Sequence, residues 1–161
     1  MARTFRIVTG DEVEALIPLL MQAEESEPAL RWSITHLADT VFRMDDGDRL
    51  LGAANVRMNS DPVEIMELAI APEHHGQGLG RHMMEFLIEE ARQRGKQKLL
   101  VGTANASIGP ITFYQKCGLR MDHVRQDYFR YLRTPAYENG IRIRDMIVFR
   151  YDLQAQTGAT I

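Results

Sequence analysis

The stretch at 64–81, EIMELAIAPEHHGQGLGR, constrains the fold of this chain more than any other. Its first part is rich in Ile, Leu and Met and stops before Pro72, whose missing backbone N–H predicts the end of a buried strand. Glycines then stand at alternate positions, Gly76, Gly78 and Gly80. Behind them apolar residues recur every four positions, which is typical of an amphipathic helix. The expected order is strand, glycine-rich loop and helix.

A glycine-rich loop in front of a helix favours the binding of phosphate. Glycine has no Cβ atom, so several backbone N–H groups can converge on one point at the positive end of the helix dipole. A dinucleotide fingerprint would need glycine where Arg81 stands, and no Gly-Lys-Ser/Thr tripeptide is present. Three glycines exceed what a tight turn needs, so we expect a phosphate nest of another kind.

The loop reads His75-Gly76-Gln77-Gly78-Leu79-Gly80 and resembles motif A, Q/R-x-x-G-x-G/A, of the GNAT superfamily of N-acetyltransferases. His75 replaces the usual Gln or Arg, whereas the glycines of the backbone nest are retained.

A second segment, 105–119 (NASIGPITFYQKCGL), resembles the other half of that superfamily's cofactor site through Asn105, Tyr114 and Gly118-Leu119. The two segments together cover about 64–120. The stretch 138–146, ENGIRIRDM, resembles the tail of the YvbK-like bacterial branch of the superfamily.

The resemblance implies acetyl-coenzyme A as cosubstrate. Its pyrophosphate would lie on the amides of 76–81, and its pantetheine arm would add like a strand beside the 68–70 backbone, where two parallel strands splay apart. Gln77 and Arg81 would add phosphate contacts, and Asn105 would either hydrogen-bond the cofactor or cap a turn. The predicted cofactor-binding residues are Leu68, Ala69, Ile70, His75, Gly76, Gln77, Gly78, Leu79, Gly80, Arg81, Asn105 and Tyr114.

Acetylation of an amine requires a base, because an alkylammonium is mostly protonated near neutral pH. Glu64 and Glu67 are the two candidates, and in an ideal strand they point to opposite faces unless a bulge intervenes. Glu64 matches the superfamily position counted back from His75, so we prefer it; the alternative is that both are edge or surface residues. Tyr114 matches the tyrosine that this superfamily often uses as general acid for the departing thiolate, the alternative being a core tyrosine with a satisfied hydroxyl.

A metal site is not expected. His74, His75 and His82 lie close in the sequence, but adjacent histidines point apart and no carboxylate or cysteine completes a convincing set of ligands.

The pattern along the chain predicts an α+β fold with one domain at 1–153 and a frayed tail at 154–161. Strands are expected at 4–8, 40–44, 50–58, 64–70, 98–103, 119–124 and 142–151, and helices at 11–24, from 28 onward, at 78–94 and at 109–116. The strand after the long helix should run parallel to its neighbour through a right-handed crossover. This is the GNAT arrangement, a mixed and mostly antiparallel sheet with splayed central parallel strands and flanking helices.

Composition limits the class of protein. With 161 residues, of which 45% are hydrophobic and 25% charged, one domain is expected. A net charge of −3 gives no nonspecific grip on nucleic acid, and no apolar run reaches membrane-spanning length. The single cysteine, Cys117, suits a reducing cytoplasm. We therefore expect a cytoplasmic protein without nucleic-acid or membrane partners; a homodimer is one possible assembly.

The predicted function is direct transfer of acetyl from acetyl-coenzyme A to a primary amine in a ternary complex. The acceptor is expected to be a small molecule, with a protein N-terminus or lysine as the other choice. The insert at 120–145 should determine it, but its aromatic residues could form a pocket or a small core, and its mixed charges favour neither an anionic nor a cationic acceptor. Alternatives are a noncatalytic acyl-coenzyme A-binding or regulatory module and a nucleotide-binding domain.

Overall fold

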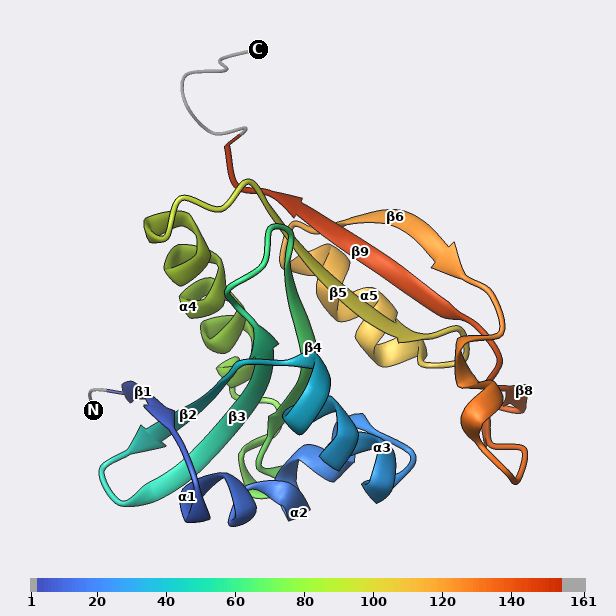
Figure 1. Ribbon diagram of the computed structural model, residues 1–161, viewed down its shortest axis with the longest axis horizontal. Helices are drawn as coiled ribbons and strands as arrows, with labels where there is room; N and C mark the ends of the chain where they lie inside the picture. Colours follow the sequence, from blue (N-terminus) through green and yellow to red (C-terminus); the bar gives the residue numbers. More distant parts are fainter. Residues whose placement is uncertain (1–2, 155–161) are drawn as a thin grey trace.

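The computed structural model describes residues 3–154, so the tail expected at 154–161 lies, beyond Gln154, outside the described residues. Its centre is a seven-stranded sheet in which only β4 and β5 run parallel, as expected (Figure 1). In spatial order the strands are β1 (Arg3–Val8), β2 (Thr40–Asp46), β3 (Arg49–Arg57), β4 (Val63–Ile70), β5 (Lys98–Ala104), β9 (Met146–Asp152) and β6 (Arg120–Arg125). The predicted mixed, mostly antiparallel α+β fold is confirmed.

Helices cover both faces of the sheet, and each layer has its own core. Helix α4 (Leu79–Gln93) buries Met83, Leu87 and Ala91 against one face, where α5 (Ile108–Lys116) adds Tyr114. The other face carries a second core under α1 (Asp11–Glu14), α2 (Ile17–Leu20), η1 (Met21–Ala23) and α3 (Glu27–Trp32), which continues into a π-helix, η2 (Ser33–Leu37).

Two predicted elements are broken in the structure. The single helix expected at 11–24 divides between α1 and α2, because Pro18 has no N–H with which to continue the helix. The strand expected at 142–151 begins only at Met146. Before it, β8 (Ile141–Arg142) pairs with β7 (Tyr137–Glu138) in a separate two-stranded sheet, in a lobe that also contains η4 (Tyr128–Tyr131).

Strands β4 and β5 separate in the middle of the sheet. They pair only between 63–65 and 99–101, although both strands continue further. At the same level β4 has one extra residue, Met66, because Asn55 of β3 faces Glu67 while Val56 faces Ile65. Such a bulge changes which residues point to each face. Ile65 therefore packs in the core under α4, whereas Ala69 packs in the core on the opposite face.

Candidate functional site

The glycine-rich loop has the geometry of a backbone nest. Gly76 and Gly78 have φ angles of 78° and 76°, in the left-handed region that favours glycine. Within residues 3–154, none of the N–H groups of 76–81 donates a hydrogen bond to another protein group. These groups lie where α4 begins, at the positive end of its dipole. The loop therefore offers a set of free donors to an anion.

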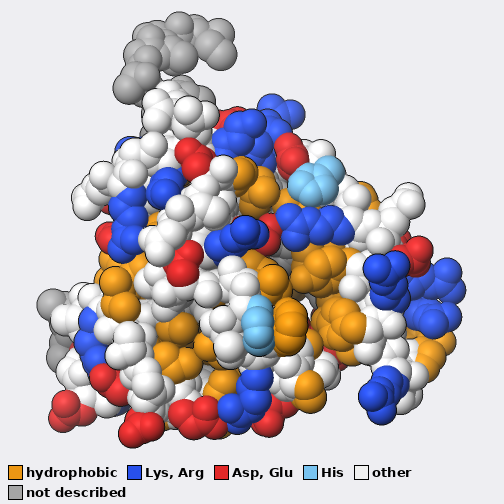
Figure 2. Space-filling model, viewed as in Figure 1, with side chains coloured by type: hydrophobic (Ala, Val, Ile, Leu, Met, Phe, Trp, Pro, Cys, Tyr) orange, Lys and Arg blue, Asp and Glu red, His pale blue; other side chains and the backbone are white. Residues whose placement is uncertain are grey.

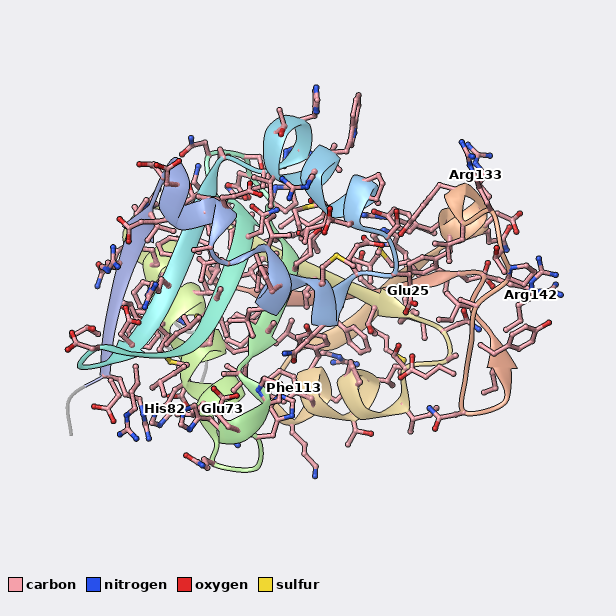
Figure 3. All side chains as sticks on the ribbon, turned by 90° about the horizontal axis from the view of Figure 1, so that it is seen from below. Glu25, Glu73, His82, Phe113, Arg133 and Arg142 are labelled. Carbon is pink, nitrogen blue, oxygen red and sulfur yellow. The ribbon has the colours of Figure 1, made fainter. Side chains whose placement is uncertain are left out.

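Gly80 has a different role from the other two glycines. A Cβ atom on Gly80 would lie 3.1 Å from the ring of Phe113, which belongs to α5. Figure 3 shows Phe113 beside the first turn of α4. Glycine at this position lets the two helices approach each other next to the separation of β4 and β5.

The end of β4 presents backbone groups to the gap between β4 and β5. The Ala71 N–H donates to the Leu51 carbonyl of β3, so alternation along the strand directs the polar groups of Leu68 and Ile70 away from β3. The Nε2 atom of His75 lies 2.7 Å from the Ile70 carbonyl oxygen. His75 thus connects the loop to β4. It also occupies the Ile70 carbonyl oxygen, which is therefore not free to accept a hydrogen bond from a ligand lying along β4.

A cleft of about 1350 Å³ opens where β4 and β5 diverge. Its walls are the segment at 22–37, the bulged part of β4, the end of β5 and the start of α5. Residues 125–138 of the lobe at 125–145 complete the walls. Three predicted catalytic residues, Glu64, Glu67 and Tyr114, line this one cleft. The bulge at Met66 explains why both glutamates reach it from the same face, against the ideal-strand expectation.

Glu67 is the most unusual carboxyl group of the cleft. Its side chain is buried, with 4% of the residue exposed, and accepts hydrogen bonds from Asn55 Nδ2 at 2.9 Å and Ser33 Oγ at 3.1 Å. Burial raises its pKa to about 7, although the two hydrogen bonds oppose the shift. A carboxyl group with this pKa can exchange a proton near neutral pH.

Glu64 is in a different situation. Its Oε1 atom lies 2.5 Å from Nη2 of Arg125, which reaches across from β6. The ion pair neutralises the carboxylate and holds it at the wall of the cleft. Because Glu64 is paired with a cation and Glu67 has none beside it among the described residues, we propose Glu67 as the base in place of Glu64, which the sequence preferred.

Tyr114 projects from α5 through the core toward the cleft. The residue is 8% exposed and lines the cleft, and among the described residues its hydroxyl makes no hydrogen bond. The alternative of a core tyrosine with a satisfied hydroxyl therefore does not fit. Burial, assisted by Cys117, raises the pKa of Tyr114, which keeps the hydroxyl protonated.

The remaining predicted contacts divide into free and occupied side chains. Gln77 and Arg81 are exposed beside the nest, and Arg81 has only a weak ion pair with Glu85 at 3.4 Å. The amide of Asn105 is occupied: it accepts from the N–H groups of 144 and 145 and donates to the carbonyl of 142. Asn105 therefore fixes the segment before β9, which supports a structural role.

Several residues in and behind the cleft were missed from the sequence. Ser33 and the fully buried Asn55, which hold Glu67, come from the π-helix and from β3, and no sequence spacing connects them with β4. The acidic run at 24–27 lines the cleft from the N-terminal helical segment. The run itself is visible in the sequence, but only the fold brings it near Glu67.

Within residues 3–154, no three His, Cys, Asp or Glu side chains are grouped closely enough to hold a metal ion. The helices of that same part of the chain are too short or too polar to span a membrane.

Comparison with known proteins identifies related chains. Residues 11–119 match the acetyltransferase (GNAT) family. The chain is 34% identical over 151 residues to the N-acetyltransferase YvbK of Bacillus subtilis, covering 92% of this chain and 96% of that protein. A GNAT family acetyltransferase from Elizabethkingia anophelis with acetyl-CoA bound has a TM-score of 0.82 at 25% identity, covering 93% and 97% of the two chains. A Bacillus subtilis acetyltransferase in complex with CoA has a TM-score of 0.80 at 28% identity, covering 94% and 99%.

Proposed function

The chain belongs to the GNAT family of acetyltransferases, and we propose that it transfers acetyl from acetyl-CoA to a primary amine bound beside Glu67. One observation carries the proposal: a buried carboxyl group of raised pKa faces the same cleft as a mostly buried tyrosine whose hydroxyl has no partner within residues 3–154. That cleft opens next to a nest of free backbone donors.

The residues present fit acetyl-CoA. The free N–H groups of 76–81 would hold its pyrophosphate, with Gln77 and Arg81 at the rim. The backbone groups of Leu68 and the Ile70 N–H would pair with its pantetheine arm in the gap between β4 and β5. When bound, acetyl-CoA supplies an acetyl group activated as a thioester.

Each catalytic side chain would handle one proton. The Glu67 carboxylate accepts a proton from the acceptor ammonium, which leaves a nucleophilic amine, directly or through an ordered water. The Tyr114 hydroxyl donates a proton to the departing sulfur. As the amine nitrogen becomes an amide it loses a second proton, which returns to the Tyr114 oxygen directly or through water. Glu67 then releases its own proton to solvent, so that ammonium and thioester become amide, free thiol and one proton.

The test is a thiol-release assay over pooled amines, peptides and aminoglycosides, with coenzyme A binding followed by calorimetry. We expect release of thiol with at least one amine pool. Binding of coenzyme A without thiol release from any pool would contradict the proposal and support the noncatalytic module. Competition by ATP at equal affinity would support the nucleotide-binding alternative.

A further inference from the structure

The charged side chains that line the cleft are predominantly acidic. Two arginines, Arg125 and Arg133, face six carboxylates, which are Glu24, Glu25, Glu27, Glu64, Glu67 and Glu138. Arg125 is paired with Glu64, and Figure 3 shows the Arg133 guanidinium pointing away from the molecule at the tip of the lobe. Lys and Arg side chains gather on the outer edge of this lobe (Figure 2). The insert at 120–145 carries charges of both signs, but most of its arginines lie outside the cleft.

Three of the carboxylates have no cation beside them in the part of the chain that the structure describes. Glu27 is paired with Arg31, and Glu138 accepts from the Ser107 hydroxyl. Glu24 accepts only from neutral donors, the Tyr131 hydroxyl at 2.7 Å and the Glu25 N–H at 2.8 Å. The Glu25 carboxylate has no protein partner among the described residues. Together with Glu67, these two leave uncompensated negative charge in the cleft.

The uncompensated carboxylates meet around one group of aromatic rings. Tyr128, Phe129 and Tyr131 lie with ring centroids 5.1–6.3 Å apart and line the cleft. Burial raises the pKa of Tyr128; Arg125 opposes this rise, and the charges of Glu24, Glu64 and Glu67 add to it. Glu24 also adds to the raised pKa of Glu67. Carboxylates and aromatic faces together are the surroundings that stabilise an organic ammonium.

Tyr114 and the acidic run come to the cleft from different elements. The Tyr114 side chain, 8% exposed, lines the cleft from α5, and its hydroxyl has no protein partner in residues 3–154. The acidic run at 24–27 lines the cleft from the N-terminal helical segment, and Figure 3 shows Glu25 between that segment and the 125–145 lobe. A ligand with an amine at each end would use both positions.

We propose that the acceptor is an aliphatic amine with a second positive charge, a diamine or polyamine. One amine would lie at Glu67 and the second ammonium beside Glu24, Glu25 and the ring of Tyr131. This inference rests on the proposed function and names the substrate class of the same site.

Three amines of equal chain length provide the test: cadaverine with an ammonium at the far end, pentylamine with a methyl group, and 5-aminopentanoate with a carboxylate. We expect kcat/KM for cadaverine to exceed that for pentylamine at least about tenfold, or 1.4 kcal/mol. 5-Aminopentanoate should react most slowly. The preference should weaken with added salt, because the rim is open to solvent. Calorimetry should show cadaverine binding in the presence of coenzyme A.

The variant Glu25→Gln should reduce the ratio of kcat/KM for cadaverine to that for pentylamine at least about threefold. Asp48→Asn makes the same change of charge in the β2–β3 turn, outside the cleft, and should leave the ratio as in the wild type. Equal or faster reaction of pentylamine or 5-aminopentanoate would overturn the inference but leave the acetyltransferase proposal intact. Preference for a peptide N-terminus or a peptide lysine over cadaverine would also overturn it. No turnover and no binding of any amine would contradict both proposals.

Discussion

The carboxyl group of Glu67 combines burial with two neutral hydrogen-bond donors, so its proton is exchangeable near neutral pH. We predict that kcat/KM of the wild type rises with pH through about 7 as Glu67 loses its proton. The Glu67→Gln variant should lose this step and about 10²–10⁴-fold in rate, and its remaining rate should rise only as free amine forms in solution.

The matched variant for this test is Glu64→Gln, on the same strand and in the same cleft. It removes the partner of Arg125 but leaves the pH profile in place. A large loss in Glu64→Gln with little change in Glu67→Gln would restore the assignment preferred from the sequence.

A carboxyl group with a raised pKa also makes stability depend on pH. The folded state holds the Glu67 proton more tightly than the unfolded chain, so its contribution to stability is full below the ordinary pKa of 4.5 and is lost as pH rises to about 7. Relative to the wild type, the free energy of unfolding of Glu67→Gln should therefore grow by about 3 kcal/mol between pH 4 and pH 8. Urea unfolding at several pH values measures the difference. A constant difference across this range would show that Glu67 titrates normally.

The hydroxyl of Tyr114 can be removed with little loss of packing, because the ring carries the contacts with Phe113 and Phe149. We predict that Tyr114→Phe lowers turnover by about 10²–10⁴-fold while coenzyme A affinity stays within about threefold. The raised pKa of Tyr114 means that the hydroxyl remains a proton donor across the working range of pH. Wild-type turnover in the variant, or loss of cofactor affinity alone, would contradict the role as acid.

At the scale of elements, the loop before α4 and the loss of pairing between β4 and β5 together form the site that we propose for coenzyme A. Gly78→Glu would place a carboxylate in the nest and strain a residue with φ 76°. Coenzyme A affinity should fall at least about tenfold, or 1.4 kcal/mol. Gly47→Glu is the control, since Gly47 has φ 60°, open space around it and a position in the β2–β3 turn. If calorimetry gave the same coenzyme A affinity for both variants, the loop would not be part of the coenzyme A site.

Sequence periodicity predicted these elements because each depends on local signals. The apolar residues of β4, the glycines and the four-residue repeat of α4 determine their own conformation. The bulge at Met66 is invisible in that pattern, because it arises from the register between β3 and β4. It turns Glu67 toward Ser33 and Asn55, and for this reason the sequence could name both glutamates but preferred Glu64 without any sign of the contacts that Glu67 makes.

At the scale of the molecule, the acidic and aromatic side of the cleft, where we propose that the acceptor binds (the acceptor wall), is assembled from segments more than 100 residues apart. The Tyr131 hydroxyl donates to Glu24 at 2.7 Å and joins the lobe at 125–145 to the N-terminal helical layer across the cleft. The sequence placed aromatic residues in this insert but could not show that they face an acidic run near the N-terminus. This hydrogen bond joins two parts of the chain, around Glu24 and around Tyr131, that both line the cleft.

Tyr131→Phe keeps the ring and removes this bond, so we predict looser attachment of the lobe. Amide hydrogen exchange at 126–134 should become several-fold faster, as expected for the loss of about 1 kcal/mol, while exchange in β4 and α4 stays as in the wild type. The acceptor KM should rise several-fold with coenzyme A affinity unchanged, because the nest lies on the other side of the β4–β5 gap. Tyr137→Phe is the matched control, since Tyr137 lies in the same lobe, is 65% exposed and has no hydroxyl partner in the described chain. Equal exchange in both variants would mean that the lobe holds its position without the bond to Glu24, and the acceptor wall would then be fixed by the aromatic cluster alone.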